Sequence, residues 1–235
     1  MTDIAWTEGT WTTEPAHLEL AEDGMRVTAI EESDAWRLTS YGFIHDTEHA
    51  LLAPFGQNTA MEVSFHLDFS AQFDQAGIFV RVDDTTWIKT GIEWSDGEES
   101  LGAVVTRGVS DWSLSPVPGW DGRHVTVRAS RSGNALTVRA RVDDDPWRLV
   151  RVAPLDPEAV VTAGPFCCAP RAITSPCTSH PGERLPRTKA CTPRLRRTKK
   201  KATVALHEKN AGWPCFRFRL CFGVRPNLTN RLGGS

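Results

Sequence analysis

The chain has 235 residues and a formal net charge of −2, and this balance hides two parts of opposite character. Residues 167–235 hold 15 of the 27 basic and 2 of the 29 acidic residues, so residues 1–166 keep 12 basic and 27 acidic ones. An acidic part of this size repels nucleic acid and anionic membranes, which excludes both as its natural partners.

The two parts also differ in their cysteine and tryptophan content. All six cysteines follow Phe166, whereas eight of the nine tryptophans precede it. We therefore predict one domain over residues 1–166 and an atypical basic tail, rich in Cys and Pro, over residues 167–235. The domain is large enough to bury a core without a disulfide or a metal. Because the N-terminus lacks a basic start with an apolar run, and no apolar stretch could cross a bilayer, we expect a cytoplasmic protein without a membrane partner.

Short alternating runs separated by turn residues predict strands throughout the domain. In chain order these runs are residues 18–20, 25–30, 36–44, 50–53, 62–69, 78–82, 87–94, 101–106, 125–129, 136–142, 147–152 and 160–166. We expect the first two runs to form a hairpin, and the next two to form another around residues 45–49. No convincing amphipathic helix exceeds two turns. So many short strands with regular turns indicate an all-β, two-sheet antiparallel jelly-roll sandwich.

The strongest turn signal is Asp96-Gly97, because a two-residue hairpin needs positive φ at both central positions. This turn pairs Ile92 with Leu101 and Glu93 with Ser100. A three-residue turn over 83–85 would place Phe79 beside Lys89 and Arg81 beside Trp87. Side chains alternate across a strand, so Ile88, Ile92 and Trp94 share a dry face while Trp87, Lys89 and Glu93 point outward.

Two patterns resemble metal sites. His45-Asp46-Thr47-Glu48-His49 fits the H-x-x-E-H pattern of zinc proteases, but that chemistry needs both histidines on one face of a helix. Here the pentapeptide is predicted to be a hairpin turn. This favours a solvent-exposed turn over a zinc site. Asp83-Asp84 and residues 143–145 could supply oxygen ligands to calcium, although acidic hairpin turns usually stay hydrated. We expect neither a metal nor another cofactor.

Three separate stretches carry a family resemblance. They are AWRLTSYGFIHD, QAGIFVRVDDTTWIKTGIEW and VVTRGVSDWS. Over roughly residues 5–168 the chain resembles the poorly characterised family named after a fungal regulator of enolase. The resemblance implies a concanavalin A-like (lectin/glucanase) jelly roll with no settled activity. It also favours residues 107–112 and the Lys89 and Glu93 positions as parts of one concave face.

The predicted outward face combines aromatic rings with charged groups, which suits a carbohydrate or another small polar ligand. The candidate binding residues are Tyr41, His66, Trp87, Lys89, Glu93, Arg107, Asp111 and Trp112. Each has a structural alternative, since large sandwiches bury tryptophans and Arg107, Asp111 and Trp112 could simply lock a bulged strand. We identify no catalytic residue.

Three functions remain open. The first is a non-catalytic binding or regulatory module, with carbohydrate as the candidate ligand. The second is a glycoside-active enzyme on the same face, but the paired acids of an E-x-D-x-x-E strand are absent and Asp96 is used in a turn. The third, suggested by the family's name, is a protein-interaction regulator of a metabolic, glycolytic enzyme.

The tail departs from the family pattern after the stretch 164–170, where the family would supply a last alternating strand. Its cysteines lack zinc-ribbon spacing, and the basic run at 194–201 would ordinarily suggest nucleic-acid contact or nuclear targeting. A third interpretation is a frameshifted translation, because suitable codons for residues 171–179 encode an alternating strand in another frame. We expect a disordered tail that is no functional module, and a sheet that lacks its last strand and keeps an unpaired edge.

Overall fold

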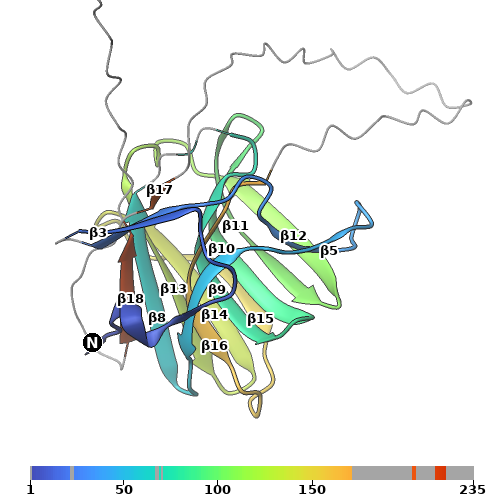
Figure 1. The fold of residues 1–235 in the computed structure, drawn as a ribbon. Helices are drawn as coiled ribbons and strands as arrows, with labels where there is room; N and C mark the ends of the chain where they lie inside the picture. The colour runs from blue at the N-terminus through green and yellow to red at the C-terminus, as the bar shows by residue number, and fades with distance from the viewer. Residues whose placement is uncertain are drawn as a thin grey trace, which may run out of the picture.

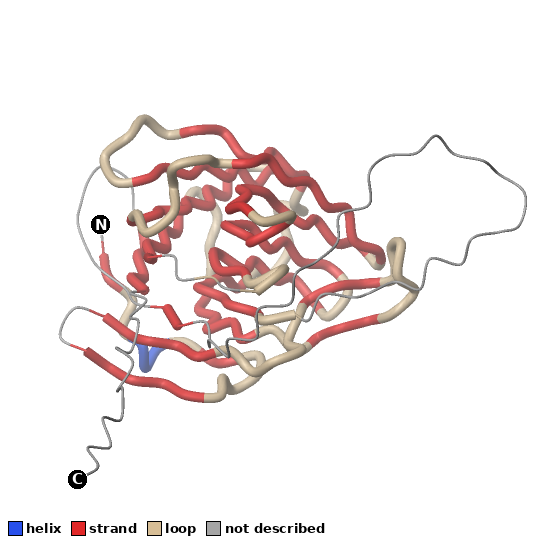
Figure 2. Tube along the Cα trace, turned by 90° about the horizontal axis from the view of Figure 1, so that it is seen from above, coloured by secondary structure: helices blue, strands red, loops and turns tan. Residues whose placement is uncertain are grey.

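Two large β-sheets pack face to face in the computed structural model (Figures 1 and 2). The structure describes residues 2–21, 24–66, 69, 71–170, 203–204 and 215–220. A short 3₁₀ helix, η1 (Trp6–Glu8), is the one helix among them. No helix in these ranges has the length and apolar character needed to span a bilayer. The prediction of an all-β sandwich is confirmed.

The first sheet has nine strands. In spatial order they are β15 (Arg148–Pro154), β14 (Ala135–Val142), β13 (His124–Ser132), β8 (Thr59–His66), β18 (Cys215–Leu220), β4 (Gly24–Thr28) and β17 (Thr203–Val204), with β3 (His17–Ala21) beside β4 and β1 (Thr2–Asp3) beside β18. The β3–β4 hairpin falls where the sequence predicts it, and β13 and β14, which pair with each other, cover the predicted runs 125–129 and 136–142.

The second sheet has seven strands and positions the candidate site. Their order is β12 (Val109–Pro116), β11 (Glu98–Arg107), β10 (Thr86–Ser95), β9 (Gln75–Asp83), β16 (Thr162–Cys168), β7 (His49–Pro54) and β2 (Thr10–Trp11). A separate two-stranded hairpin consists of β5 (Ala35–Arg37) and β6 (Ile44–Asp46). We call this hairpin, residues 35–46, the flap.

The predicted register of strands β9, β10 and β11 is confirmed. Ile92 lies opposite Leu101 across the Asp96-Gly97 turn. On the other side of β10, Lys89 lies opposite Phe79 and Trp87 lies opposite Arg81, as predicted. The turn itself differs, because Asp83 pairs with Thr86 and a bulge between Thr86 and Trp87 sets this register. Gly77 and Gly91 face each other across β9 and β10, where an added Cβ on Gly91 would lie 2.0 Å from the Ala76 carbonyl oxygen. This close approach explains glycine at both positions.

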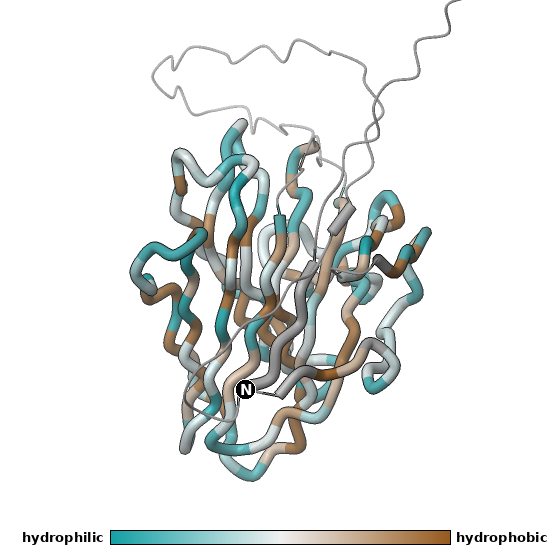
Figure 3. The backbone as a smooth tube through the Cα atoms, turned by 90° about the vertical axis from the view of Figure 1, so that its left-hand side faces the viewer, coloured by the Kyte–Doolittle hydropathy of each residue, from teal (hydrophilic) through white to brown (hydrophobic). Residues whose placement is uncertain are grey.

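The main core lies between the two sheets. Along β8 the inward side chains Val63 and Phe65 are fully buried, as are Ile78 on β9 and Val127 on β13. Figure 3 shows hydrophobic and hydrophilic residues alternating along several strands, the pattern that places one face of each strand in this core. Ile88 and Ile92 lie on the core-facing side of β10, as predicted, whereas the side chain of Trp94 is partly exposed.

A second hydrophobic cluster covers the opposite face of the second sheet. Trp36 of the flap packs there with Phe79, Trp87 and Phe166. Trp87 is only 3% exposed and stacks on Phe79 with ring centroids 5.3 Å apart. The predicted assignment of the β10 side chains to the two faces of the strand is therefore right. The expectation that Trp87 and Lys89 are exposed is wrong, because the flap and its neighbours cover them.

The flap also corrects a predicted pairing. The sequence suggests that residues 36–44 form one strand paired with 50–53 around a turn at 45–49. Instead, the first run folds back on itself, so that Trp36 pairs with His45. Strand β7 pairs with β16 and with β2.

The C-terminal part differs from expectation in two respects. Strand β16 continues to Cys168, and Ala169 bridges to Glu31, so the domain extends past the predicted boundary at residue 166. Strand β18 lies between β8 and β4 in the first sheet and parallel to β8, although we expect no ordered strand in the tail. The predicted disorder and frameshift concern residues that lie mostly outside the described ranges.

Candidate functional site

A pocket lies between the flap and the second sheet. The empty space within its lining is about 420 Å³ when the open solvent at its mouth is included. The flap and the segment just before it supply Asp34, Trp36, Tyr41 and Phe43, and the rest of the lining is Phe73, Gln75, Lys89, Glu93, Val104, Trp112 and Pro170. We call this cavity the flap pocket.

A buried ion pair occupies the floor of the flap pocket. Lys89 Nζ donates to Asp34 Oδ1 over 2.6 Å, and the two side chains are 4% and 17% exposed. Asp34 Oδ1 also accepts from the Ala35 backbone N–H over 2.8 Å and from Gln75 Nε2 over 3.5 Å. The Asp34 backbone is itself fixed through Thr47, whose N–H donates to the Asp34 carbonyl oxygen over 2.9 Å. These contacts hold the carboxylate in place before any ligand arrives.

Lys89 remains a cation despite its burial. Burial by itself would lower the pKa of Lys89, but the negative charges of Asp34 and other nearby acidic groups raise it above its ordinary value. The amine is therefore charged at neutral pH, and its charge is balanced by Asp34.

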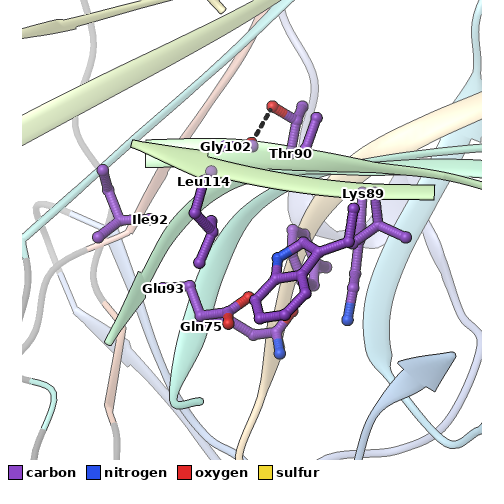
Figure 4. A pocket seen from close by; sticks show the side chains of 12 residues that line it. Gln75, Lys89, Thr90, Ile92, Glu93, Gly102 and Leu114 are labelled. Atoms are coloured by element: carbon purple, nitrogen blue, oxygen red, sulfur yellow. Dashed lines mark hydrogen bonds between the residues drawn. The ribbon is translucent and has the colours of Figure 1, made fainter. Parts of the chain in front are cut away.

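Glu93 is the second acidic group of the pocket. Burial raises the pKa of Glu93 to about 7, while Lys89 acts in the opposite direction and Asp34 adds to the rise. No side chain or backbone group of the described part of the chain hydrogen-bonds to its carboxyl group. Figure 4 shows Glu93, Gln75 and Lys89 extending to one side of the sheet while Thr90 lies on the other. Glu93 is thus positioned to exchange a proton or to bind a ligand donor.

Aromatic rings form the walls above this floor. Trp36 and Trp112 meet edge to face at 6.1 Å, and Phe73 meets Trp112 at 6.3 Å. Tyr41 and Phe43 stack at 5.4 Å near the mouth. The indole Nε1 of Trp112 is buried and has no acceptor within the described ranges. The pocket therefore combines flat apolar surfaces with a few fixed polar groups.

Four of the eight predicted site residues line the flap pocket: Tyr41, Lys89, Glu93 and Trp112. Trp87 lies on the same sheet face but lines a second recess on the other side of the flap, with Glu48 and Arg81. Half of the predicted residues therefore line the flap pocket, although they make up only four of its eleven lining residues.

The other three predicted residues lie elsewhere. His66 is on the first sheet, where its ring meets His124 at 5.0 Å. Arg107 donates to the Pro154 carbonyl oxygen. Asp111 is paired with Arg151 at 2.9 Å, on the face of β12 opposite to Trp112. The structure does not bring these three to the pocket.

Sequence reasoning missed several pocket residues, chiefly Asp34, Trp36, Phe43 and Gln75. Trp36 and Phe43 lie within AWRLTSYGFIHD, and Gln75 begins QAGIFVRVDDTTWIKTGIEW, so the stretches that carry the resemblance contained the signal. Asp34 comes one residue before the first stretch. Its role depends on a contact with Lys89, 55 residues away, which no local pattern reveals.

The H-x-x-E-H segment has a structural role. His49 is buried, its Nε2 accepts from the Ile30 backbone N–H over 3.0 Å, and its Nδ1 lies 3.0 Å from the Thr13 carbonyl oxygen. Burial lowers the pKa of His49, which favours the neutral ring that these two contacts require. Both nitrogens serve to tie β7 to neighbouring segments, so a zinc ion could bind only by breaking these bonds.

Comparison with known proteins shows which family model and which relatives the chain matches. A family model described as "Protein of unknown function (DUF1349)" matches residues 11–181. Regulation of enolase protein 1 of Saccharomyces cerevisiae is 35% identical over 164 residues, which cover 70% of this chain and 82% of that protein. An uncharacterized protein of Emericella nidulans is 32% identical over 89 residues, 36% of this chain and 40% of its own.

A solved structure shares the fold. The crystal structure of a functionally unknown protein from Saccharomyces cerevisiae matches with a TM-score of 0.66 and 34% identity, over 72% of this chain and 90% of that one. The family match over most of the domain identifies the chain as a member of the DUF1349 family, and the chain is similar to the yeast regulation of enolase protein.

Proposed function

We propose that this domain is a non-catalytic binding module and that the flap pocket is its ligand site. The ligand class that we propose is a carbohydrate or a similar small polyhydroxylated molecule. One observation carries the proposal: a buried Lys89–Asp34 pair and the unbonded Glu93 carboxyl lie together beneath a wall of aromatic rings.

The chemistry of the pocket supports this ligand class. Sugar rings present apolar C–H faces that pack on aromatic side chains such as Tyr41 and Trp112, and hydroxyls that both donate and accept hydrogen bonds. Lys89 keeps further N–H donors beyond the one given to Asp34, and Glu93 offers acceptor oxygens. Because the ion pair is already assembled, little ordering of side chains would be needed on binding.

A glycoside-active enzyme is the alternative that one observation favours. Asp34 and Glu93 place two carboxyl groups in one pocket, and a pKa of about 7 would suit Glu93 as a general acid. Against this, Asp34 Oδ1 accepts three hydrogen bonds and is paired with Lys89, which leaves it poorly suited as a nucleophile or base. We therefore prefer binding without turnover.

The name of the yeast relative supports a second alternative. Regulation of enolase protein 1 is named for an effect on a glycolytic enzyme, which suggests a protein-interaction regulator of a metabolic enzyme. A cytoplasmic location, proposed from the sequence, would agree with such a partner. A ligand-binding pocket and a regulatory role are compatible if the ligand controls the interaction.

A glycan-array screen with two variants tests the proposal. Tyr41→Ala removes a ring from the pocket mouth, and Ile44→Ala removes an exposed side chain of the same flap that does not line the pocket. We expect wild type and Ile44→Ala to bind the same glycans and Tyr41→Ala to bind them weakly. An array without any bound glycan, or equal binding by all three proteins, would reject the flap pocket as a carbohydrate site. Hydrolysis of a bound glycan would favour the enzyme alternative.

A further inference from the structure

We infer that the flap pocket prefers sugars that carry a protonated amine, with the ammonium group bound by the side chains of Glu93 and Gln75. This inference rests on the proposed function and names a narrower ligand class within it. Its basis is a pair of buried hydrogen-bond acceptors that lack a donor among the described residues, in a pocket whose charges do not balance.

Glu93 and Gln75 lie directly opposite each other on the antiparallel strands β10 and β9. Their side chains are 7% and 4% exposed, and both extend to the same side of the sheet, where they line the flap pocket (Figure 4). Directly opposite residues of such a pair have Cβ atoms about 4.5–5.5 Å apart, so the two polar ends are neighbours. A ligand group that reaches one of them can therefore reach the other.

Both side chains offer acceptor oxygens to a ligand. The amide nitrogen of Gln75 donates to the Phe73 carbonyl oxygen over 3.1 Å and to Asp34 Oδ1 over 3.5 Å, which leaves the amide oxygen for other partners. Neither this oxygen nor the Glu93 carboxyl group accepts a hydrogen bond from a residue in the described ranges. An ammonium group has three N–H donors and no acceptor, so it can bond to both at once, whereas a hydroxyl has one hydrogen to donate.

The charges around these acceptors leave one negative charge without a partner. Lys89 Nζ is bonded to Asp34 over 2.6 Å, so these two charges balance each other. The Cys168 thiol near this pair is neutral, because burial raises its pKa. Ionised Glu93 therefore adds an uncompensated charge, and burial raises the pKa of this group to about 7. A ligand cation beside Glu93 would compensate the charge and favour the ionised carboxylate.

Aromatic rings in the lining add to the preference for a cation. Tyr41, Phe43, Phe73 and Trp112 all line the pocket. The faces of such rings carry a negative electrostatic potential that attracts an ammonium group. The pocket opens to solvent, so the rest of the sugar or of a longer glycan can lie outside it. An N-acetylated amine carries no charge and a single N–H, and it would gain from neither the carboxylate nor the rings.

Calorimetric titration of the full chain at pH 7 with matched sugars tests the inference. The ligands are glucose, galactose and mannose, their 2-amino-2-deoxy and 6-amino-6-deoxy derivatives, and the N-acetyl forms of these amines. For at least one sugar, the amino form should bind about tenfold more tightly than the hydroxyl and N-acetyl forms, which corresponds to about 1.4 kcal/mol. Equal binding of the three forms, or tighter binding of the N-acetyl form, would overturn the inference and leave a carbohydrate function standing. If no form of any sugar binds, the inference and the proposed function both fail.

Two variants test whether Glu93 is the source of the preference. Glu93→Gln keeps the shape of the side chain and removes its charge, so it should lose the preference for the amino form. Glu98→Gln removes an exposed carboxylate outside the pocket and should keep it.

The same titrations in two buffers of different ionisation enthalpy count the protons released. Because Glu93 is about half protonated at pH 7, wild type should release about half a proton more than Glu93→Gln on binding the amino sugar. A preference that survives in Glu93→Gln, or equal proton release by the two proteins, would overturn the binding of the amine by Glu93.

Discussion

The pH dependence of stability offers a quantitative test of the environment assigned to Glu93. The pKa of this carboxyl group is raised from 4.5 to about 7 in the folded protein, chiefly by burial. Between these two values the folded protein holds a proton that the unfolded chain has released. Folding therefore becomes less favourable as the pH rises through this window, and the stabilising contribution is complete only below pH 4.5.

The size of the effect follows from the shift. A pKa difference of one unit corresponds to about 1.4 kcal/mol, so Glu93 should cost about 2 to 3 kcal/mol of stability between pH 5 and pH 8. The Glu93→Gln variant has the same shape and no proton to release. Its free energy of unfolding, relative to wild type, should rise by that amount over the same interval.

Urea denaturation followed by tryptophan fluorescence at pH 5, 6, 7 and 8 measures this difference. Effects of all other titrating groups largely cancel when the variant is compared with wild type at each pH. Glu98→Gln, at an exposed position next to the Asp96-Gly97 turn, controls for the loss of one negative charge. A difference between Glu93→Gln and wild type that stays constant with pH would refute the argument that Glu93 is buried and poorly solvated.

Three further substitutions test the packing around the site, each by denaturant unfolding. Trp87→Ala should cost about 3–5 kcal/mol, because Trp87 is 3% exposed and stacked on Phe79; a loss below about 1 kcal/mol would contradict the second cluster. Lys89→Met should cost about 3 kcal/mol by leaving the Asp34 carboxylate unpaired, and adding Asp34→Asn should restore part of the loss; no restoration would contradict the ion pair. Gly91→Ala should prevent folding or severely destabilise the domain, since its Cβ would collide with the backbone of β9, and a stable Gly91→Ala protein would contradict the close strand pairing.

The sheet register was predictable because it depends on local chemistry. Asp96 and Gly97 have φ values of 55° and 92°, the positive values that a two-residue hairpin turn requires and that the Asp-Gly pair favours. Once this turn is fixed, every pair from Ser95–Glu98 to Thr86–Arg107 follows from counting. The same counting places Lys89 and Glu93 on one face.

The flap was not predictable because, of the three positive-φ residues in its turn, only Gly42 (φ 73°) is of the usual type. Leu38 and Ser40 adopt φ values of 63° and 65°, a conformation that non-glycine residues seldom take. Without a glycine or asparagine at these positions, the run from Trp36 to Ile44 looks like one continuous strand. The turn is instead held by backbone hydrogen bonds, including Leu38 N–H to the Phe43 carbonyl oxygen over 2.8 Å.

The burial of Trp87 and Lys89 was hidden for a related reason. Alternation along β10 shows which face a side chain occupies, but it does not reveal whether a distant segment covers that face. Here the cover comes from the flap, about 50 residues earlier in the chain, together with Phe166 of β16. Sites formed by such long-range contacts require the fold before their members can be identified.

The indole N–H resonances of the tryptophans give the most direct test of the flap pocket as a ligand site. In ¹⁵N-labelled protein these side-chain signals are separate from the backbone signals and can be assigned by substitution. Titration with the sugar selected on the array should shift the signals of Trp36 and Trp112, which line the pocket, and leave Trp120 and Trp147 unchanged. Shifts confined to Trp120 and Trp147, or no shifts at saturating sugar, would contradict binding in the flap pocket.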